Sequence, residues 1–378
     1  MLLWTLTVAL YAMHLSRLLI YDTSEVVHTA LFLVVPYAAA IILYQVFCAL
    51  APKLPVSSIP VERLSESDIY RLDHILGRAL IFWVICTLVE IVVSGGLPII
   101  WLIRGSSKTY FDFGIPSVHG FLNSLVLAIA LCEVGLFAID GKKKRLWIPI
   151  AVVLWSIVVV TRNLMIVSLI QSGIIWGLLR GVNWRTLLKS VVIILVLILA
   201  FGYIGDFRSG AESFRLVAMP SDDYPDWLPS GVLWVYIYLT TPMGNLVHTT
   251  VGTVPLNSFL FPNTASLLFP TVIRHVVYGK VGSAEAFGGD LVASTFNVST
   301  AYVGPYQDYG YLGVCCFSVM LALVAIYCWR KLGFMGTLMY GVIGQCVILT
   351  VFFNNLFDLP VITQIPWFYF FFRKLKRG

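Results

Sequence analysis

Ionisable and aromatic side chains gather at the start of one long apolar segment, where they could act together. Asp308 lies there, and three tyrosines surround it in the sequence, Tyr302, Tyr306 and Tyr309. Aromatic faces can stack on sugar rings, and a carboxylate can hold or deprotonate a sugar hydroxyl. This segment therefore predicts sugar binding by the tyrosines, with Asp308 as a candidate catalytic base. The structural alternative is a helix-capping acid beside an aromatic belt at a membrane interface.

A second candidate pair, Asp112 and His119, lies in a loop rich in glycine and proline between two apolar segments. These residues break the preceding helix, and Pro116 is a good first-turn residue for the next one. Both side chains are expected to face one cavity, beside a helix N-terminus that favours an anion. They are further candidates for acid–base catalysis. The alternative is a buried histidine with satisfied hydrogen bonds and an aspartate that caps a turn.

Several arginines near segment ends could bind phosphate, because a planar guanidinium takes two phosphate oxygens at once. A group of them on one cavity would bind pyrophosphate without a metal. The candidates are Arg162, Arg208, Arg274, Arg215 and Arg104. The alternative is that some are membrane-interface anchors, and Arg208, Glu212 and Arg215 have the helical spacing of ordinary ion pairs.

Arg162 is the leading phosphate candidate because of the segment around it. Basic residues flank the segment 146–179 at both ends, so the chain must turn back in its middle, at Arg162. Each half then rises only about 24 Å, less than the hydrocarbon core of about 30 Å. We therefore expect Arg162 below the membrane surface, in a water-filled cavity, where an arginine is costly unless it has a function.

The elements that must position these residues are membrane helices. Of the 378 residues, 59% are hydrophobic and only 12% are charged, and the mean hydropathy is +0.89. A soluble protein carries about 25% charged residues. The sequence therefore predicts an all-α polytopic membrane protein with about 10–12 helices in one domain, 1–378. The spans that we expect are 1–21, 29–51, 79–103, 114–138, 146–161, 163–179, 187–205, 310–329, 333–354 and 359–372.

The largest loop, residues 206–309, contains two apolar stretches, 231–247 and 255–273, which we expect to form re-entrant or interfacial helices. The lysines and arginines concentrate in alternate loops, so the positive-inside rule places both termini in the cytoplasm and the candidate residues outside. No basic stripe for nucleic acid and no metal-binding motif is present, although Asp222, Asp223 and Asp226 loosely resemble a metal cluster. All cysteines lie in apolar segments, so no disulfide framework is expected.

With these residues in place, the sequence resembles the bacterial oligosaccharide repeat-unit polymerases, the Wzy-type O-antigen polymerases. The resemblance lies in the multi-span layout with one large loop and in short motifs. These are Gly96-Leu-Pro98, Asp112-Phe-Gly-Ile-Pro116 with His119-Gly120, Arg162, Gly205-Asp-Phe-Arg208, and Asp308-Tyr-Gly310.

The resemblance implies a membrane glycosyltransferase of the C type (GT-C) in the bacterial inner membrane, with its active site facing the periplasm. Such enzymes transfer a growing glycan from undecaprenyl pyrophosphate to a new lipid-linked repeat unit, without metal or cofactor. The lipid-linked oligosaccharide is both donor and acceptor, and a flippase and a chain-length regulator are candidate partners. The family's arginines match Arg162, Arg208 and Arg274. Two alternatives stay open: an O-antigen ligase, which differs only in its acceptor, and a flippase or transporter of lipid-linked sugars.

Overall fold

The computed structural model describes residues 2–19, 64–181, 211–225, 230–279, 291–293, 296–330, 333–373 and 375, with residues 34, 35, 38, 39, 42, 43, 45, 46 and 188 between these ranges. Within them the chain is helical and forms no named strand, only an isolated bridge between Ser16 and Pro220. The predicted spans 29–51 and 187–205 lie almost entirely outside the described residues, so they stay predictions.

The helices (α) and short 3-10 helices (η) of the described residues are α1 (Leu2–Tyr11), η1 (Arg17–Leu19), α3 (Glu66–Ser94), α4 (Pro98–Ile103), η2 (Tyr110–Asp112), α5 (Val118–Asp140), η3 (Lys143–Leu146), α6 (Trp147–Val158), α7 (Arg162–Arg180), α9 (Ala211–Ala218), α10 (Ser230–Gly252), α11 (Pro262–Ala265), η4 (Ser266–Leu268), α12 (Thr271–Tyr278), α13 (Val303–Arg330), α14 (Phe334–Ile348), η5 (Leu349–Val351), η6 (Asn355–Phe357), α15 (Leu359–Ile362) and α16 (Gln364–Arg373).

Five helical segments of the described chain are long and apolar enough to cross a membrane, and they confirm an all-α membrane protein. They are Glu66–Ile103, Val118–Asp140, Asn163–Arg180, Val303–Arg330 and Phe334–Val351. The 23 residues of α5 alone rise about 35 Å, more than a hydrocarbon core. The full number of spans stays a prediction, as does the GT-C architecture.

The first predicted span, 1–21, does not form one continuous helix. Helix α1 ends at Tyr11, His14 has a positive φ of 50°, and the chain then runs beside residues 218–220. The Ser16 hydroxyl donates to the Ala218 carbonyl at 2.7 Å, and this bond helps to hold the bent chain. The prediction was wrong here because the polar residues after Tyr11 favour this tertiary contact over further helix.

The predicted reversal at Arg162 is confirmed for the backbone. Helix α6 ends at Val158 and α7 begins at Arg162, with Val160 between them at a φ of 57°. A positive φ is costly for a β-branched residue, so this turn is tight and strained. With 12 residues, α6 rises only about 18 Å, which leaves the turn short of a full crossing.

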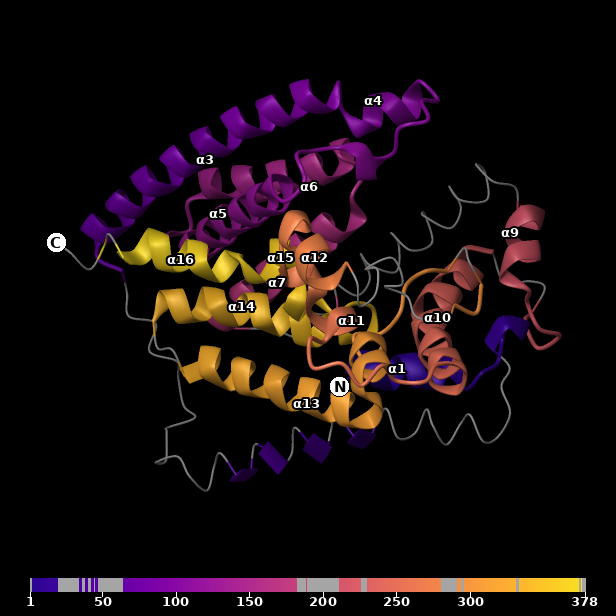
Figure 1. Cartoon of the computed structure of the whole chain (residues 1–378). Helices are drawn as coiled ribbons and strands as arrows, with labels where there is room; N and C mark the ends of the chain where they lie inside the picture. The colour runs from indigo at the N-terminus through magenta and orange to yellow at the C-terminus, as the bar shows by residue number, and fades with distance from the viewer. Residues whose placement is uncertain are drawn as a thin grey trace.

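Helix α5 is the centre of the bundle and contacts α3, α6, α7, α14, α15 and α16. Its apolar residues are almost all buried, whereas α3 runs along one side and exposes many apolar side chains (Figure 1). Gly135 allows the close approach of α14, because a Cβ there would lie 2.6 Å from the Phe334 ring. Helix α13 packs on the far side of α14.

The two ends of the bundle differ in charge. At one end, which we call the basic end, Arg145 is buried and binds Asp73, Glu133 and Asp140 at 2.7–3.0 Å. Three basic residues precede Arg145 in the sequence. At the opposite end, which we call the loop end, α3 finishes and α5 and α7 begin. The candidate loop 95–118 lies there, with α15 between α5 and η4.

The described part of the large loop contains helices joined by irregular stretches such as residues 253–261. Helix α10 contains Pro242 and packs against α1, α9 and α13, and the short helices α11 and α12 flank η4 (Figure 1). The stretch 255–273 is thus broken into short turns rather than one long helix. Whether these elements enter the bilayer stays a prediction.

Candidate active site

The loop end begins where two glycines stop α3. Gly95 adopts a φ of 76° and caps the helix through bonds from its backbone N–H to the carbonyls of Ile91 and Val92. Gly96 follows with a φ of 140°, and a Cβ there would lie 2.9 Å from the Trp101 indole nitrogen. Only glycine fits both conformations easily. The chain therefore turns sharply and starts α4 at Pro98.

His119 and Glu90 form a hydrogen-bonded pair under this loop. The His119 Nδ1 atom lies 3.0 Å from Glu90 Oε2, and Nε2 lies 3.0 Å from the Asn123 amide nitrogen. The second oxygen of Glu90 accepts the backbone N–H of Ile115 at 3.0 Å. The Glu90 side chain is only 1% exposed, whereas that of His119 is 23% exposed. A buried carboxylate thus orients an imidazole that solvent can reach.

The turn before α5 holds the imidazole in place. Gly114 has a φ of 93°, and a Cβ there would lie 2.6 Å from His119 Cγ. Its N–H donates to the Ser94 hydroxyl at 2.8 Å. The Phe113 ring packs edge-on against the imidazole, with centroids 5.3 Å apart. Phe113 also belongs to a small buried cluster with Trp101 and Val159, which joins this turn to α4 and to the end of α6.

Asp112, the other candidate in this loop, caps its own turn. Its Oδ2 accepts the Thr109 N–H at 2.7 Å and the Thr109 hydroxyl at 3.1 Å. The bond from the Thr109 backbone lowers the pKa of the Asp112 carboxyl below its usual 3.8. A weakly basic carboxylate that is bonded locally suits a turn cap better than a general base.

An open pocket of about 370 Å³ lies between α4, this loop and the turn between α6 and α7; we call it the loop pocket. Lys108, Thr109, Tyr110 and Phe111 line it, and Val160 contributes from the turn. The Lys108 ammonium donates to the Ser94 carbonyl at 2.9 Å and lies 5.2 Å from the centre of the Trp101 ring. The pocket therefore contains a fixed positive charge, Lys108, and is also lined by Val160, which lies two residues before Arg162 in the sequence.

The structure describes the side chains of three of the five candidate arginines, Arg104, Arg215 and Arg274. Arg104 is exposed at the end of α4, next to the loop pocket, and Arg215 is half-buried on α9, which packs against α10. Arg162 is the first residue of α7, although its side chain is not described, and Arg208 lies outside the described residues. A single pyrophosphate site built from all five arginines therefore stays a prediction.

Arg274 lies on α12 and is bound to backbone. Its guanidinium donates to the carbonyls of Ser266 and Phe269, at 3.1 and 3.3 Å. It also lies near Asp358, the residue that precedes α15. Burial raises the pKa of the Asp358 carboxyl from 3.8 to about 6, and the positive charge of Arg274 opposes this rise. The two residues thus link η4 and α12 to the start of α15.

Asp308 is fully buried and accepts four hydrogen bonds. Its Oδ1 accepts the Asn263 N–H at 3.1 Å and the Asn263 side-chain amide at 2.9 Å. Its Oδ2 accepts the Thr264 N–H at 2.8 Å and the Thr264 hydroxyl at 2.6 Å. These donors begin the short helix α11, so the carboxylate fastens α11 to α13. This geometry favours the structural reading of Asp308 over the role of base.

The three candidate tyrosines also face the interior. Tyr302 and Tyr306 are buried; the Tyr302 ring packs against Trp4, and the Tyr306 hydroxyl donates to the Thr250 carbonyl at 3.0 Å. The Tyr309 ring packs between Phe259 and Phe261, at a kink where Tyr309 and Gly310 leave helical geometry. Their sugar-binding role stays a prediction, and none of the three offers an open ring face like that of Phe111.

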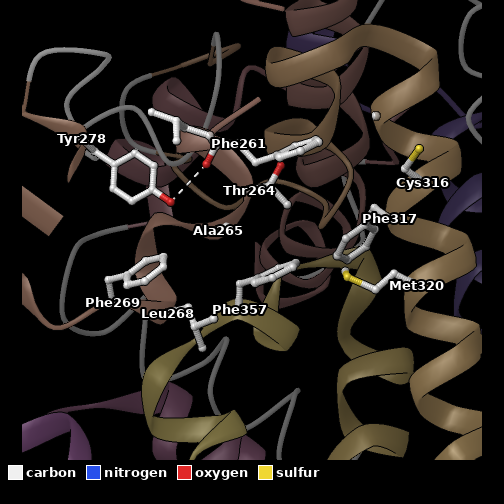
Figure 2. Close-up of a pocket in the computed structure, with 12 residues that line it drawn as sticks. Phe261, Thr264, Ala265, Leu268, Phe269, Tyr278, Cys316, Phe317, Met320 and Phe357 are labelled. Atoms are coloured by element: carbon white, nitrogen blue, oxygen red, sulfur yellow. Dashed lines mark hydrogen bonds between the residues drawn. The ribbon is translucent and has the colours of Figure 1, made fainter. Parts of the chain in front are cut away.

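An apolar cavity of about 340 Å³ lies between α11, η4, α12, α13 and η6. Figure 2 shows aromatic and sulfur-containing side chains pointing into it, with the Thr264 hydroxyl among them. The Tyr278 hydroxyl donates to the Leu260 carbonyl at 3.1 Å, which closes one side. Its lining suits a hydrocarbon chain rather than a polar molecule.

The short segment η6–α15 separates this cavity from His119. Phe357 of η6 lines the cavity, while Leu359 of α15 packs on α5 at Gly120, where a Cβ would lie 3.2 Å from the leucine side chain. The segment η6–α15 therefore lies between the apolar cavity and the start of α5, the helix that carries His119. Sequence reasoning did not foresee this, nor the partners of Glu90 and Asp308, because each contact joins elements far apart in the chain.

Among the described residues, no group of three histidine, cysteine, aspartate or glutamate side chains could hold a metal ion. The chain matches no protein-family model, no curated protein and no solved structure.

Proposed function

We propose that this membrane protein polymerises oligosaccharide repeat units that are linked to undecaprenyl pyrophosphate, by transferring the growing glycan as a block. The observation that carries the proposal is a partly exposed imidazole, His119, which a buried carboxylate orients, on a helix that contacts the same short segment, η6–α15, as an apolar cavity. A lipid-linked sugar needs both environments at once, since its reactive sugar is polar and its anchor is a hydrocarbon.

His119 is the base in this proposal. The acceptor hydroxyl replaces Asn123 at Nε2, and this nitrogen takes the hydroxyl proton as the oxygen bonds to the anomeric carbon of the donor glycan. The bond from that carbon to the pyrophosphate breaks, and its electron pair leaves with undecaprenyl pyrophosphate. Glu90 orients the imidazole and stabilises the imidazolium that forms. Asp308 is less suited, because four donors already occupy its carboxylate.

The leaving pyrophosphate needs positive charge at the same end of the bundle. Lys108 supplies a fixed ammonium at the loop pocket, and Arg162 begins α7 directly after the turn that lines this pocket. The positive end of the α7 dipole adds to the charge of Arg162. Arg208 and Arg274 remain candidates for the same task. The undecaprenyl chain enters the apolar cavity, which lies between the long helix α13 and the short helices α11 and α12.

The proposal also fixes the orientation in the membrane. The basic end faces the cytoplasm and the loop end faces the periplasm, as the positive-inside rule requires. The donor and acceptor are thus both lipid-linked units delivered to the periplasmic face of a bacterial inner membrane by a flippase.

Reconstitution tests this function. Purified protein in liposomes receives the undecaprenyl-pyrophosphate-linked repeat unit in the presence of EDTA, and the products are separated on a gel. We expect a ladder spaced by one repeat unit, with release of undecaprenyl pyrophosphate. Folded protein that yields no ladder but moves the lipid-linked unit across the bilayer would be a transporter instead.

A further inference from the structure

The most exposed aromatic side chain of the candidate loop has no structural task that the fold explains. Phe111 is 79% exposed at the loop pocket, and its ring stacks against that of Tyr110, with centroids 4.0 Å apart and an angle of 34°. Exposing so much apolar surface costs free energy in water, so a ring held at the mouth of a pocket is often a contact for a ligand or a bilayer.

We propose that the loop pocket binds a sugar ring of the glycan, with Phe111 and Tyr110 as its stacking platform. This inference rests on the proposed function and locates its sugar subsite. A pocket of about 370 Å³ lies within the usual size of small-ligand sites. Aromatic faces that lie beside a few polar groups match a sugar, which presents a face of C–H bonds and a rim of hydroxyls.

The polar groups of the pocket are suitably placed for these hydroxyls. The Lys108 ammonium is fixed on the Ser94 carbonyl at 2.9 Å, so it keeps its position when the pocket is empty. Thr109 also lines the pocket, and two bonds to Oδ2 of the neighbouring Asp112 hold it in place, one of them donated by its hydroxyl. The ammonium can donate to a sugar hydroxyl and the Thr109 oxygen can accept from one, so together they can fix the orientation of a ring.

The composition of the loop favours a sugar over the hydrocarbon of a bilayer. Residues 105–112 read Gly-Ser-Ser-Lys-Thr-Tyr-Phe-Asp, and all of them are exposed. A segment that inserts into lipid would place its ammonium and carboxylate there at high cost. The neighbouring helix α4 is the better candidate for contact with lipid. It contains no charged residue, and its Ile103 is as exposed as Phe111.

A continuous set of contacts joins this subsite to His119. Lys108 lies over the Trp101 ring, whose centroid is 6.3 Å from that of Phe113, and Phe113 lies 5.3 Å from the imidazole. A sugar bound on Phe111 would thus lie on the same packed loop that positions the proposed base. The buried tyrosines of α13 cannot provide such a platform without unpacking the core.

Binding of the free repeat-unit oligosaccharide tests this subsite without any catalysis. Mild acid releases the oligosaccharide from the lipid-linked material of the ladder assay, and calorimetry measures its binding to the full chain in lipid nanodiscs. We expect Phe111→Ala and Tyr110→Ala each to weaken binding about ten-fold, the size of a typical aromatic contact. Phe111→Trp should bind like the wild type, since it keeps the ring face.

Ile103→Ala is the matched control, because it removes a side chain of the same exposed fraction at the same end of the protein. It should leave oligosaccharide binding unchanged. The subsite is wrong if Phe111→Ala binds as tightly as the wild type or if the wild type, active in the ladder assay, does not bind. If Phe111→Ala binds the oligosaccharide normally but loses thermal stability in nanodiscs and not in detergent, Phe111 is a membrane anchor and not a sugar contact. Absence of both ladder and binding would overturn the proposed function itself.

Discussion

A carboxylic acid inside an apolar helix needs partners, and Glu90 has two, the imidazole of His119 and the backbone N–H of Ile115. Both side chains are visible in the sequence, yet their pairing is not, because 29 residues separate them. The intervening loop closes on itself through glycines and Ser117 at positive φ. The sequence thus predicted His119 as a candidate, but not its pairing with Glu90.

Asp308 gives a prediction about stability. Replacing it with alanine leaves four donors of Asn263 and Thr264 without an acceptor. An unsatisfied buried donor costs about 1–3 kcal/mol, so we expect Asp308→Ala to lower the unfolding free energy by several kcal/mol. Thermal unfolding in detergent measures this loss of stability. A variant that unfolds like the wild type yet makes no ladder would instead support Asp308 as the base.

Asp358 gives a prediction about pH. Its pKa is about 6 in the folded protein and 3.8 in the reference state, because burial disfavours the charged carboxylate. The folded state therefore binds more protons between these values, and the stability that this carboxyl contributes is full at low pH and is lost as the pH rises through about 6. We expect the wild type to be less stable at about pH 7 than at about pH 5, and Asp358→Asn to reduce this difference.

Asp112→Asn is the control for this titration. Its exposed carboxyl has a lowered pKa and is ionised in both the folded and the unfolded protein over this range. It should leave the pH dependence of thermal unfolding as it is in the wild type. If thermal unfolding depends on pH equally in Asp358→Asn and the wild type, the raised pKa of Asp358 is not the cause of that dependence.

At the scale of elements, the turn into α5 depends on Gly114. A Cβ at this position would lie 2.6 Å from His119 Cγ, so Gly114→Ala must displace the imidazole. We expect the rate of ladder formation to fall at least about ten-fold, since a small misplacement of a base is costly. Gly141→Ala is the matched control: this glycine also has a positive φ, of 70°, but a Cβ there meets nothing within 4 Å, and it lies at the other end of α5. Equal rates in the two variants would disprove the positioning role of the turn.

Helix positions were easier to predict than the contacts between helices. Apolar length placed α5 within four residues at each end, whereas α13 begins seven residues before the predicted start and α14 ends six residues before the predicted end. The flanking charges placed the reversal between α6 and α7. The sequence failed at α1, where the polar residues after Tyr11 contact residues 218–220. It also failed to predict that η6 and α15 lie between the apolar cavity and His119, because such short turns have no periodicity of their own.

At the scale of the whole molecule, the different charge of the two ends predicts which end faces which side of the membrane. Ser106 at the loop end and Lys143 at the basic end are both exposed. In cells, Ser106→Cys should react with a membrane-impermeant maleimide added outside, whereas Lys143→Cys should react only after permeabilisation. Both variants are made in a Cys316→Ser background, because Cys316 is an exposed native thiol. The reverse pattern would place the proposed site in the cytoplasm.

The central claim is that His119 acts as the base in glycan transfer. A ladder assay that compares two histidine variants with the wild type tests it most directly. Wild type, His119→Ala and His74→Ala are reconstituted in liposomes with the lipid-linked repeat unit. His74 is exposed on α3 toward the basic end, where its ring packs on Tyr70. We expect His74→Ala to match the wild type and His119→Ala to lose about 100-fold or more in rate. A His119→Ala protein that forms ladders at the wild-type rate would contradict the account.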